Sequence, residues 1–279
     1  MGLRSDDDNL AKVLATLDQA GVRDSTDIMV VSDHGFSTIA RSVDIVAILR
    51  SAGFDAVKAF DQKPSDGQVI VVSLGGSTSF YVIGHEQKTT HRLVEFLQHS
   101  DFAGVIFTRN PVLGTFLLSQ AGIETPDAPD VVVAMRWMDL VSQTGMPGMM
   151  ISSSVKYQAG QGHHGSLGPS DMHNTLIASG PDFKRGYVDT LPSGNVDVAP
   201  TVLWLLGVKQ SKPMDGRVLA EAMRDCDIAV PTPLVQKQEV ELRFSDAIWR
   251  QYLRTISMGS TFYCDQGNGS VETLRAAGQ

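Results

Sequence analysis

Cysteine, basic charge and long apolar runs are all scarce in this 279-residue chain. Its two cysteines, Cys226 and Cys264, could form one bond, but two free thiols are expected, and both a disulfide scaffold and a cysteine-rich zinc site are excluded. Lys and Arg number 23 against 31 Asp and Glu, so the net charge is −8 and no binding to a nucleic-acid polymer is expected. No run approaches the ~20 apolar residues of a membrane span, so no membrane segment is expected.

The first residues also lack the features of an export signal. Met1–Asp8 has no apolar stretch and is acidic where a signal peptide would be basic. The sequence as given therefore carries no signal peptide, and its localisation stays open.

The residues that are present favour a folded α/β domain. Apolar residues make up 42% of the chain, enough to bury a substantial core. Apolar periodicity alternates between helical and strand spacing, which is typical of a central sheet sandwiched between helices. Helices are predicted over residues 6–20, 43–52, 89–100, 197–206 and 217–224, and strands over 28–32, 69–74, 79–83, 105–108, 115–118, 131–135 and 174–179. The strands over 69–74 and 79–83 flank Gly75-Gly76 and are expected to form a hairpin.

Composition also suggests how the chain is divided. Residues 1–230 are expected to form the α/β domain, with residues 54–128 as an inserted α+β subregion. Residues 141–172 lack periodicity and are expected to be a long loop region, and loops of that length are usually functional or mobile. Pro231 and Pro233 indicate a hinge to a small polar C-terminal appendage, residues 231–279.

The first motif that carries chemistry is Asp33-His34-Gly35, which follows the apolar run at 28–32. Ligands gather at the carboxyl ends of strands in open α/β sheets, and Gly35 permits the turn that brings both side chains to one point. A carboxylate with an imidazole suits zinc or a similar divalent ion. The alternative is that Asp33 caps the next segment and His34 is a partly buried polar residue.

The second motif is Gly160-Gln-Gly-His163-His164-Gly165. Histidines between glycines are poorly suited to core packing, whereas the glycines let the backbone approach a ligand closely. The alternative is a solvated surface loop.

Together with Met172-His-Asn-Thr-Leu-Ile-Ala-Ser-Gly-Pro181 and Asn195-Val-Asp-Val-Ala-Pro-Thr201, these motifs resemble the alkaline phosphatase superfamily. Within it, the chain is most similar to the type I phosphodiesterase/nucleotide pyrophosphatase family, over residues 6–224. The resemblance implies an alkaline phosphatase-like fold and hydrolysis of a small phosphorylated substrate, such as a nucleotide or another phosphodiester. Relatives are often periplasmic or extracellular.

The resemblance also implies two divalent ions, zinc as the expected metal, on either side of the phosphoryl group. Asp33 and His34 match the pair that binds the ion at the nucleophile, and His164 matches a ligand of the other ion. His163 is an alternative ligand, or a donor that orients the ligands.

Part of the family's site is not found in this sequence. No His precedes His34, and no Ser or Thr stands where the family places its nucleophile. We therefore expect an incomplete fold, the C-terminal portion of a longer enzyme with the nucleophile missing. Three ligands spread over two ions predict weak metal occupancy and an inactive isolated chain.

Two alternatives stay open. The same superfamily includes hydrolases of phosphonates, phosphomonoesters and sulfate esters, and Gly-His-His-Gly-Ser-Leu at residues 162–167 is similar to phosphonoacetate hydrolase-like relatives. The chain could also be a truncated, non-catalytic remnant that binds a partner or substrate without converting it.

Overall fold

The computed structural model describes residues 2–60 and 62–274. Those residues form two compact units. The first comprises residues 2–33, 175–234 and 257–263, and the second comprises 34–60, 62–174, 235–256 and 264–274. The division predicted at residues 230 and 231 stays a prediction.

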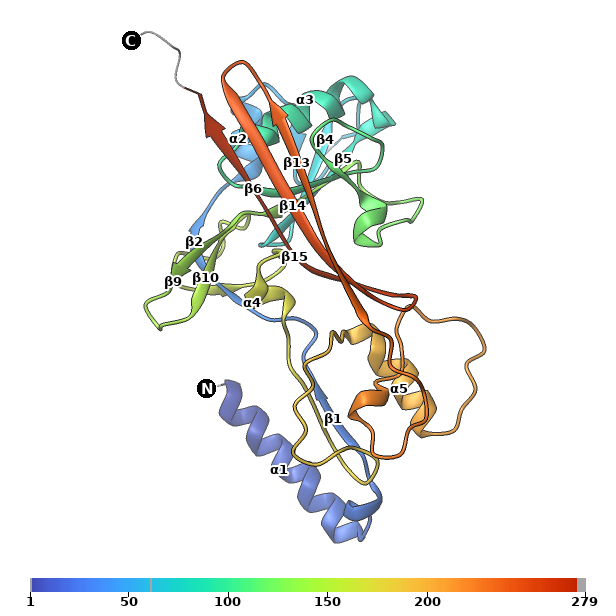
Figure 1. The fold of residues 1–279 in the computed structure, drawn as a ribbon. Helices are drawn as coiled ribbons and strands as arrows, with labels where there is room; N and C mark the ends of the chain where they lie inside the picture. The colour runs from blue at the N-terminus through green and yellow to red at the C-terminus, as the bar shows by residue number, and fades with distance from the viewer. Residues whose placement is uncertain (1, 61, 275–279) are drawn as a thin grey trace. The chain divides into compact units, whose positions relative to one another are not determined.

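The first unit contains a long helix, α1 (Gly2–Ala20), and a two-stranded antiparallel sheet of β1 (Ile28–Val31) and β12 (Leu176–Ser179) (Figure 1). On the apolar stripe of α1, Leu10, Leu14 and Leu17 are half-buried and Val13 is exposed. The expectation that residues 28–32 lie buried in a parallel sheet is wrong: Val30 and Val31 are 38% and 37% exposed. Among the described residues no other strand joins this pair, so its side chains have few neighbours.

The rest of the first unit is short helices and turns. The predicted helix at 197–206 is confirmed as α5 (Val198–Leu205), whereas that at 217–224 is reduced to the 3₁₀ turn η5 (Ala220–Ala222). Two further 3₁₀ turns are η1 (Arg23–Ser25) and η4 (Asn195–Asp197).

A six-stranded sheet forms the centre of the second unit. Its order is β3 (Ala56–Val57), β4 (Val69–Ser73), β5 (Ser77–Val82), β8 (Val131–Met135), β6 (Ala103–Thr108) and β7 (Phe116–Leu117). The predicted hairpin around Gly75-Gly76 is confirmed, since β4 and β5 pair antiparallel. The 3₁₀ turns η2 (Ile83–His85) and η3 (Leu118–Ala121) follow β5 and β7.

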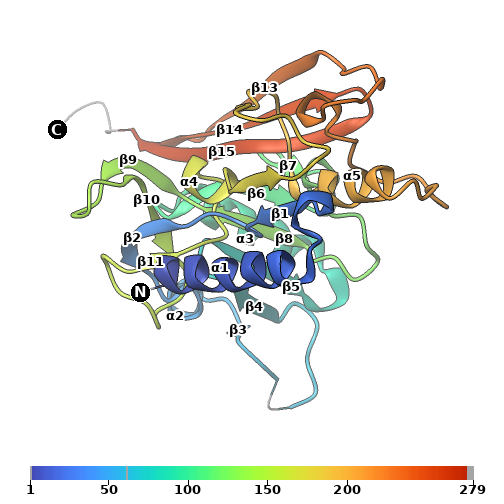
Figure 2. The same cartoon turned by 90° about the horizontal axis from the view of Figure 1, so that it is seen from below.

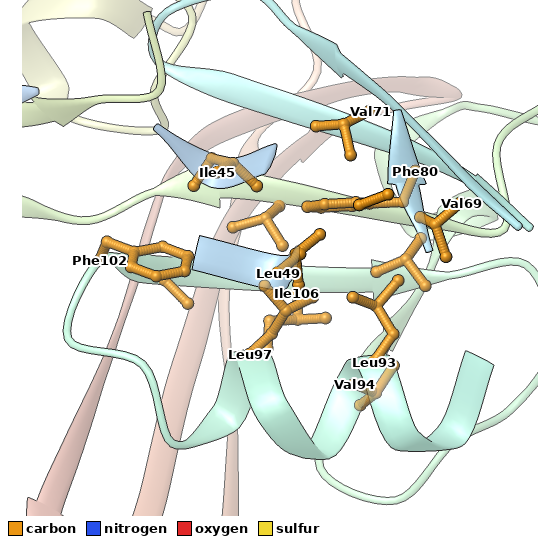
Figure 3. Packing of buried hydrophobic residues seen from close by; sticks show 14 of the residues in the cluster. Ile45, Leu49, Val69, Val71, Phe80, Leu93, Val94, Leu97, Phe102 and Ile106 are labelled. Atoms are coloured by element: carbon orange, nitrogen blue, oxygen red, sulfur yellow. The ribbon is translucent and has the colours of Figure 1, made fainter. Parts of the chain in front are cut away.

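Helices α2 (Ile45–Ser51) and α3 (Gln87–Gln98) contribute to the main core of this unit. The Asp44 carboxylate caps α2 by accepting a hydrogen bond from the Ala47 amide. Leu93 and Leu97 point from α3 toward Leu49 of α2 and Ile106 of β6 (Figure 3). Helical spacing therefore buries one face of each helix, as the sequence pattern predicts.

A second sheet in this unit has the order β11 (Gly162–His163), β2 (Ser37–Ser42), β10 (Pro147–Ser152) and β9 (Trp137–Val141) (Figure 2). The expectation of a loop over 141–172 is therefore wrong, because the segment contains β10, β11 and the short helix α4 (Pro169–Met172). These strands pair with β2, more than 100 residues away in sequence. Such distant pairing leaves no local periodicity to detect.

Long strands occupy most of the segment that the sequence assigns to the C-terminal appendage. Its strands β13 (Pro233–Arg243), β14 (Ala247–Met258) and β15 (Thr261–Thr273) form one sheet in that order. Trp249 of β14 is fully buried, and its indole N–H donates to the Gly114 carbonyl.

The molecule is thus a mixed α/β protein, which confirms the predicted fold class. None of the helices in the described residues is long and apolar enough to cross a membrane.

Candidate functional site

His34 and His164, which are 130 positions apart in sequence, lie face to face in the second unit. Their ring centroids are 3.8 Å apart and their planes differ by only 13°. Phe36 contacts both rings, at centroid distances of 5.3 Å and 5.4 Å. The structure therefore brings together two of the histidines that the sequence analysis selected.

Hydrogen bonds fix how the His34 ring can react. Its Nδ1 lies 2.9 Å from the carbonyl oxygen of Gly35. A neutral ring in this position donates from Nδ1–H, so its Nε2 carries the lone pair. Nε2 is then the atom of His34 that could bind a cation.

His163 has a different environment. Its Nδ1 accepts a hydrogen bond from the His164 amide, which leaves Nε2 as the protonated nitrogen of the neutral ring. The Tyr157 ring meets it edge-on, with a centroid distance of 4.7 Å, and a Cβ added at Gly75 would lie about 2.1–2.5 Å from His163 ring atoms. His163 is therefore a packed ring whose free lone pair is already used.

The hairpin turn between β4 and β5 holds the histidine loop. The Gly76 amide donates to the His164 carbonyl over 2.8 Å, and a Cβ at Gly76 would lie 2.2 Å from the Ser166 nitrogen. The sequence predicts the hairpin at Gly75-Gly76 but not this close contact. The sequence does contain a signal for this contact. Both the Gly75-Gly76 turn and the histidine loop are rich in glycine, which allows two backbones to approach closely.

Asp171, also missed, links the two motifs. Its carbonyl accepts from the Gly35 amide, and its carboxylate Oδ2 accepts from the amide and hydroxyl of Ser166. The residue is only 4% exposed, and no hydrogen bond to Oδ1 is found among the described residues. Gly35 is needed here because a Cβ would lie 2.1 Å from the Ser170 carbonyl oxygen; its role is close approach rather than the expected sharp turn.

A cavity of about 410 Å³ adjoins the histidines. The ionisable side chains that line this cavity are the two imidazoles and the Tyr157 phenol. Three serines also line it. Its lining is Ser73, Leu74, Gly75, Ser77, Ser154, Tyr157, His163, His164 and Gly165. A substrate group in this cavity would meet hydroxyls rather than fixed charges.

Asp33 belongs to the first unit and directly precedes His34. The Asn195 side-chain amide donates to the Asp33 carbonyl over 2.8 Å. Next to it, the Ser32 amide donates to the Thr175 carbonyl, and the Ser32 hydroxyl accepts from the Thr175 amide. These contacts fix the backbone at the end of β1.

A buried polar network stabilises the first unit around the Asn195–Thr201 motif. Asp197 is fully buried and accepts from the amides of Gly194 and Arg217 and from the Tyr263 hydroxyl. Burial and the adjacent Asp197 raise the pKa of Tyr263 well above its ordinary value. The Arg217 guanidinium binds both carboxylate oxygens of Glu221. Burial alone would raise the pKa of Glu221, but the hydrogen bonds from Arg217 outweigh it and the pKa is lowered.

The imidazole and carboxylate groups of the two motifs are of the types that bind a divalent metal, but too few of them lie together to form a complete site. Imidazole and carboxylate are ordinary zinc ligands, yet a stable zinc site uses at least three protein ligands. Within residues 2–60 and 62–274, no group of three or more His, Cys, Asp or Glu side chains is placed to hold an ion. The two stacked imidazoles are therefore a partial donor set.

Comparison with known proteins gives one match. The family model for type I phosphodiesterase / nucleotide pyrophosphatase matches residues 2–166, a segment that contains both histidine motifs. No curated protein and no solved structure matches the chain. Since the match spans more than half of the sequence, this chain belongs to the type I phosphodiesterase / nucleotide pyrophosphatase family of the alkaline phosphatase superfamily.

Proposed function

We propose that the protein takes part in metal-dependent hydrolysis of phosphoric esters, with nucleotides, nucleotide pyrophosphates or other phosphodiesters as substrates, and that this chain contributes part of the site. The observation that carries the proposal is the parallel contact of His34 with His164 at 3.8 Å. The contact brings two imidazoles, which are ordinary ligands of divalent metals, together from distant parts of the sequence.

The ring geometry supports two ions rather than one. A nitrogen lone pair lies in the plane of its ring, so two nearly parallel rings cannot direct their lone pairs to one point. We assign His34 and the preceding Asp33 as ligands of one divalent ion and His164 as a ligand of a second, with zinc as the proposed metal. Such a pair supplies Lewis-acid stabilisation of charge on phosphoryl oxygens. His163, whose Nδ1 is already hydrogen-bonded, orients His164 instead of binding an ion.

The chain's own residues hold this arrangement in place. Asp171 ties Gly35 to the histidine loop, and Gly76 holds the His164 carbonyl. Because each proposed ion receives only one or two side chains from this chain, zinc affinity should be several kcal/mol weaker than at a three-ligand site. No nucleophile is assigned to any residue of the chain.

Zinc binding tests the proposal directly. Isothermal titration of the 279-residue protein should show zinc binding that His34→Ala and His164→Ala each weaken at least about tenfold, since each removes an imidazole ligand. His91→Ala, an exposed histidine on α3, is the matched control and should bind like the unaltered protein. If all three variants bind zinc equally, the histidine pair is not the site.

Substrate comparison then separates the related reactions. Zinc-loaded protein would be assayed on p-nitrophenyl phosphodiester, phosphomonoester, phosphonate ester and sulfate ester. Fastest turnover of the diester supports the proposal, whereas preference for another ester favours the alternative reaction of the same superfamily.

A second candidate, a non-catalytic protein that binds substrate or a partner, is favoured by one observation. The described residues gather no group of three metal-ligating side chains. Elemental analysis showing less than one zinc per chain, without turnover of any ester, would support it. Two zinc ions per chain with hydrolysis would exclude it.

A further inference from the structure

A basic hollow of about 740 Å³ lies in the first unit, outside the candidate site. It is formed where Arg23 and Asp24 lead into β1 and where Gly180 and Pro181 leave β12. Because β1 and β12 are antiparallel, with Ile28 opposite Ser179, these two segments meet at the same end of the sheet. The hollow is thus a feature of one compact unit.

Its charge is opposite to that of the whole chain. Four cationic side chains line it, Arg23, Lys184, Arg185 and Arg224, against the one acid, Asp24. The chain as a whole carries −8. A local cluster of one sign in a hollow raises the concentration of counter-ions there, so this place attracts anions.

The guanidinium groups are available for such an anion. Across residues 2–60 and 62–274, no hydrogen bond or ion pair engages the side chains of Arg23, Arg185 or Arg224. The Lys184 ammonium donates to the Glu221 carbonyl and lies 5.2 Å from the centre of the Tyr187 ring. The Lys184 ammonium is therefore already engaged, whereas the three arginine side chains keep their N–H donors for a ligand.

Nearby carboxylates do not neutralise the cluster. Glu221 is bound on both oxygens by Arg217. Asp27 accepts a hydrogen bond from the Asp182 amide, and its pKa is raised by burial and by the Asp182 side chain. Each of these acids has another partner, so the positive charge of the hollow persists.

The hollow is separate from the residues assigned to hydrolysis. Asp33 follows the opposite end of β1, and a four-residue strand is about 13 Å long. Neither Asp33 nor any of the histidines of the candidate site lines the hollow. Anion binding in the hollow would therefore be independent of the proposed hydrolysis.

We propose that this hollow is a second binding site, for a small anion that carries two or more linked phosphoryl groups. A guanidinium group can form bidentate hydrogen bonds with phosphate oxygens. Several arginines around one hollow therefore suit an anion with several phosphoryl groups better than one with a single group. The volume lies within the range of small-ligand sites. A nucleic-acid polymer fits less well, because the acidic chain would repel the phosphates beyond the hollow.

Inorganic pyrophosphate is the probe that tests the site. Titration calorimetry would use the 279-residue protein with EDTA in about 50 mM salt, so that metals play no part and charges are only partly screened. We expect one saturable site with a Kd of about 10–100 µM. Inorganic phosphate should bind at least about tenfold more weakly, because it engages fewer guanidinium groups.

A matched pair of double variants locates the binding. Arg185→Gln with Arg224→Gln should weaken pyrophosphate binding at least about tenfold, since it removes two of the four cations. Lys209→Gln with Lys212→Gln removes the same charge from exposed positions of the same unit outside the hollow, and should change the Kd less than about twofold. All four residues are exposed, so thermal unfolding without ligand checks that both variants are folded.

Three results would overturn the inference. The unaltered protein could show no saturable binding, both double variants could weaken binding equally, or phosphate could bind as tightly as pyrophosphate. The second result would mean that diffuse surface charge attracts the anion. Each is independent of zinc binding at His34 and His164.

Discussion

The two units bury their apolar side chains very differently. Both hydrophobic clusters found among the described residues lie wholly in the second unit, around Phe80, Leu97 and Trp249 in the larger one and Leu253 in the smaller. In the first unit many large apolar side chains stay exposed, among them Leu3 at 86%, Val188 at 81% and Leu206 at 69%. Its most buried charged residues instead form the network around Asp197.

This difference shows that one chain can stabilise its parts by different interactions. Packing in the second unit gains from removal of apolar area from water, which needs no particular angle. The network in the first unit depends on oriented donors and acceptors, so it tolerates less change at any one member. Substitutions should therefore act through cavity size in one unit and through unpaired charge in the other.

The largest expected effect is in the core of the second unit. Phe80→Ala should lower the free energy of unfolding by roughly 3–5 kcal/mol, because it leaves a cavity in a fully buried cluster. Leu206→Ala, in the first unit, should cost less than about 0.5 kcal/mol. Urea unfolding, with hydrogen exchange in β6 and β8, measures both. Equal losses in the two variants would contradict the contrast between the units.

The network of the first unit should respond to loss of one partner and to pH. Arg217→Met should cost roughly 3 kcal/mol because it leaves the Glu221 carboxylate buried and unpaired, and Arg217→Met with Glu221→Leu should recover much of this. The measurement is hydrogen exchange of the segment around residues 217–223. A double variant no more stable than the single one would show that packing, not charge, sets the loss.

The lowered pKa of Glu221 fixes the sign of the pH dependence. A carboxyl whose pKa is lower when folded adds stability above its ordinary value of 4.5, and that stability is lost as pH falls through the folded pKa. The stability gap between the natural protein and Glu221→Gln should therefore shrink on acidification.

The smallest expected effect concerns the thiol of Cys264, in the second unit. Burial raises its pKa to about 11, so only about 0.1% is thiolate at pH 8. Alkylation followed by peptide mapping should label Cys264 roughly a hundredfold more slowly in the folded chain than in denaturant. Equal rates in both states would show that burial does not protect this thiol.

Sequence periodicity predicted the helices and strands whose apolar residues recur at regular helical or strand spacing. The strand over 131–135 is observed with those bounds, and the helix predicted over 89–100 is observed over Gln87–Gln98. Strand β10 could not be predicted in the same way. Its Pro147, Gly148 and methionines are weak strand formers, and its pairing with β2 and β9 determines its conformation.

For the candidate site, the sequence indicated which histidines to consider but not the tertiary contacts that hold them in place. His34 and His164 could be selected because their motifs resemble a family, and their role as metal ligands stays a prediction. The link through Asp171 and the packing of Gly75 under His163 arise from tertiary contacts. No spacing rule within either motif reports such contacts.

The contact between the Gly75-Gly76 turn and the histidine loop also constrains which sequence changes the protein can accept. A side chain at Gly75 would collide with the His163 ring, and one at Gly76 would collide with the backbone of residues 164–166, so neither position tolerates substitution. Directed evolution aimed at the proposed ester hydrolysis should therefore randomise Leu74, Ser154 and Tyr157 on the adjoining cavity and keep the two glycines fixed. The Gly75-Gly76 turn must therefore keep its two glycines while the residues that line the cavity vary.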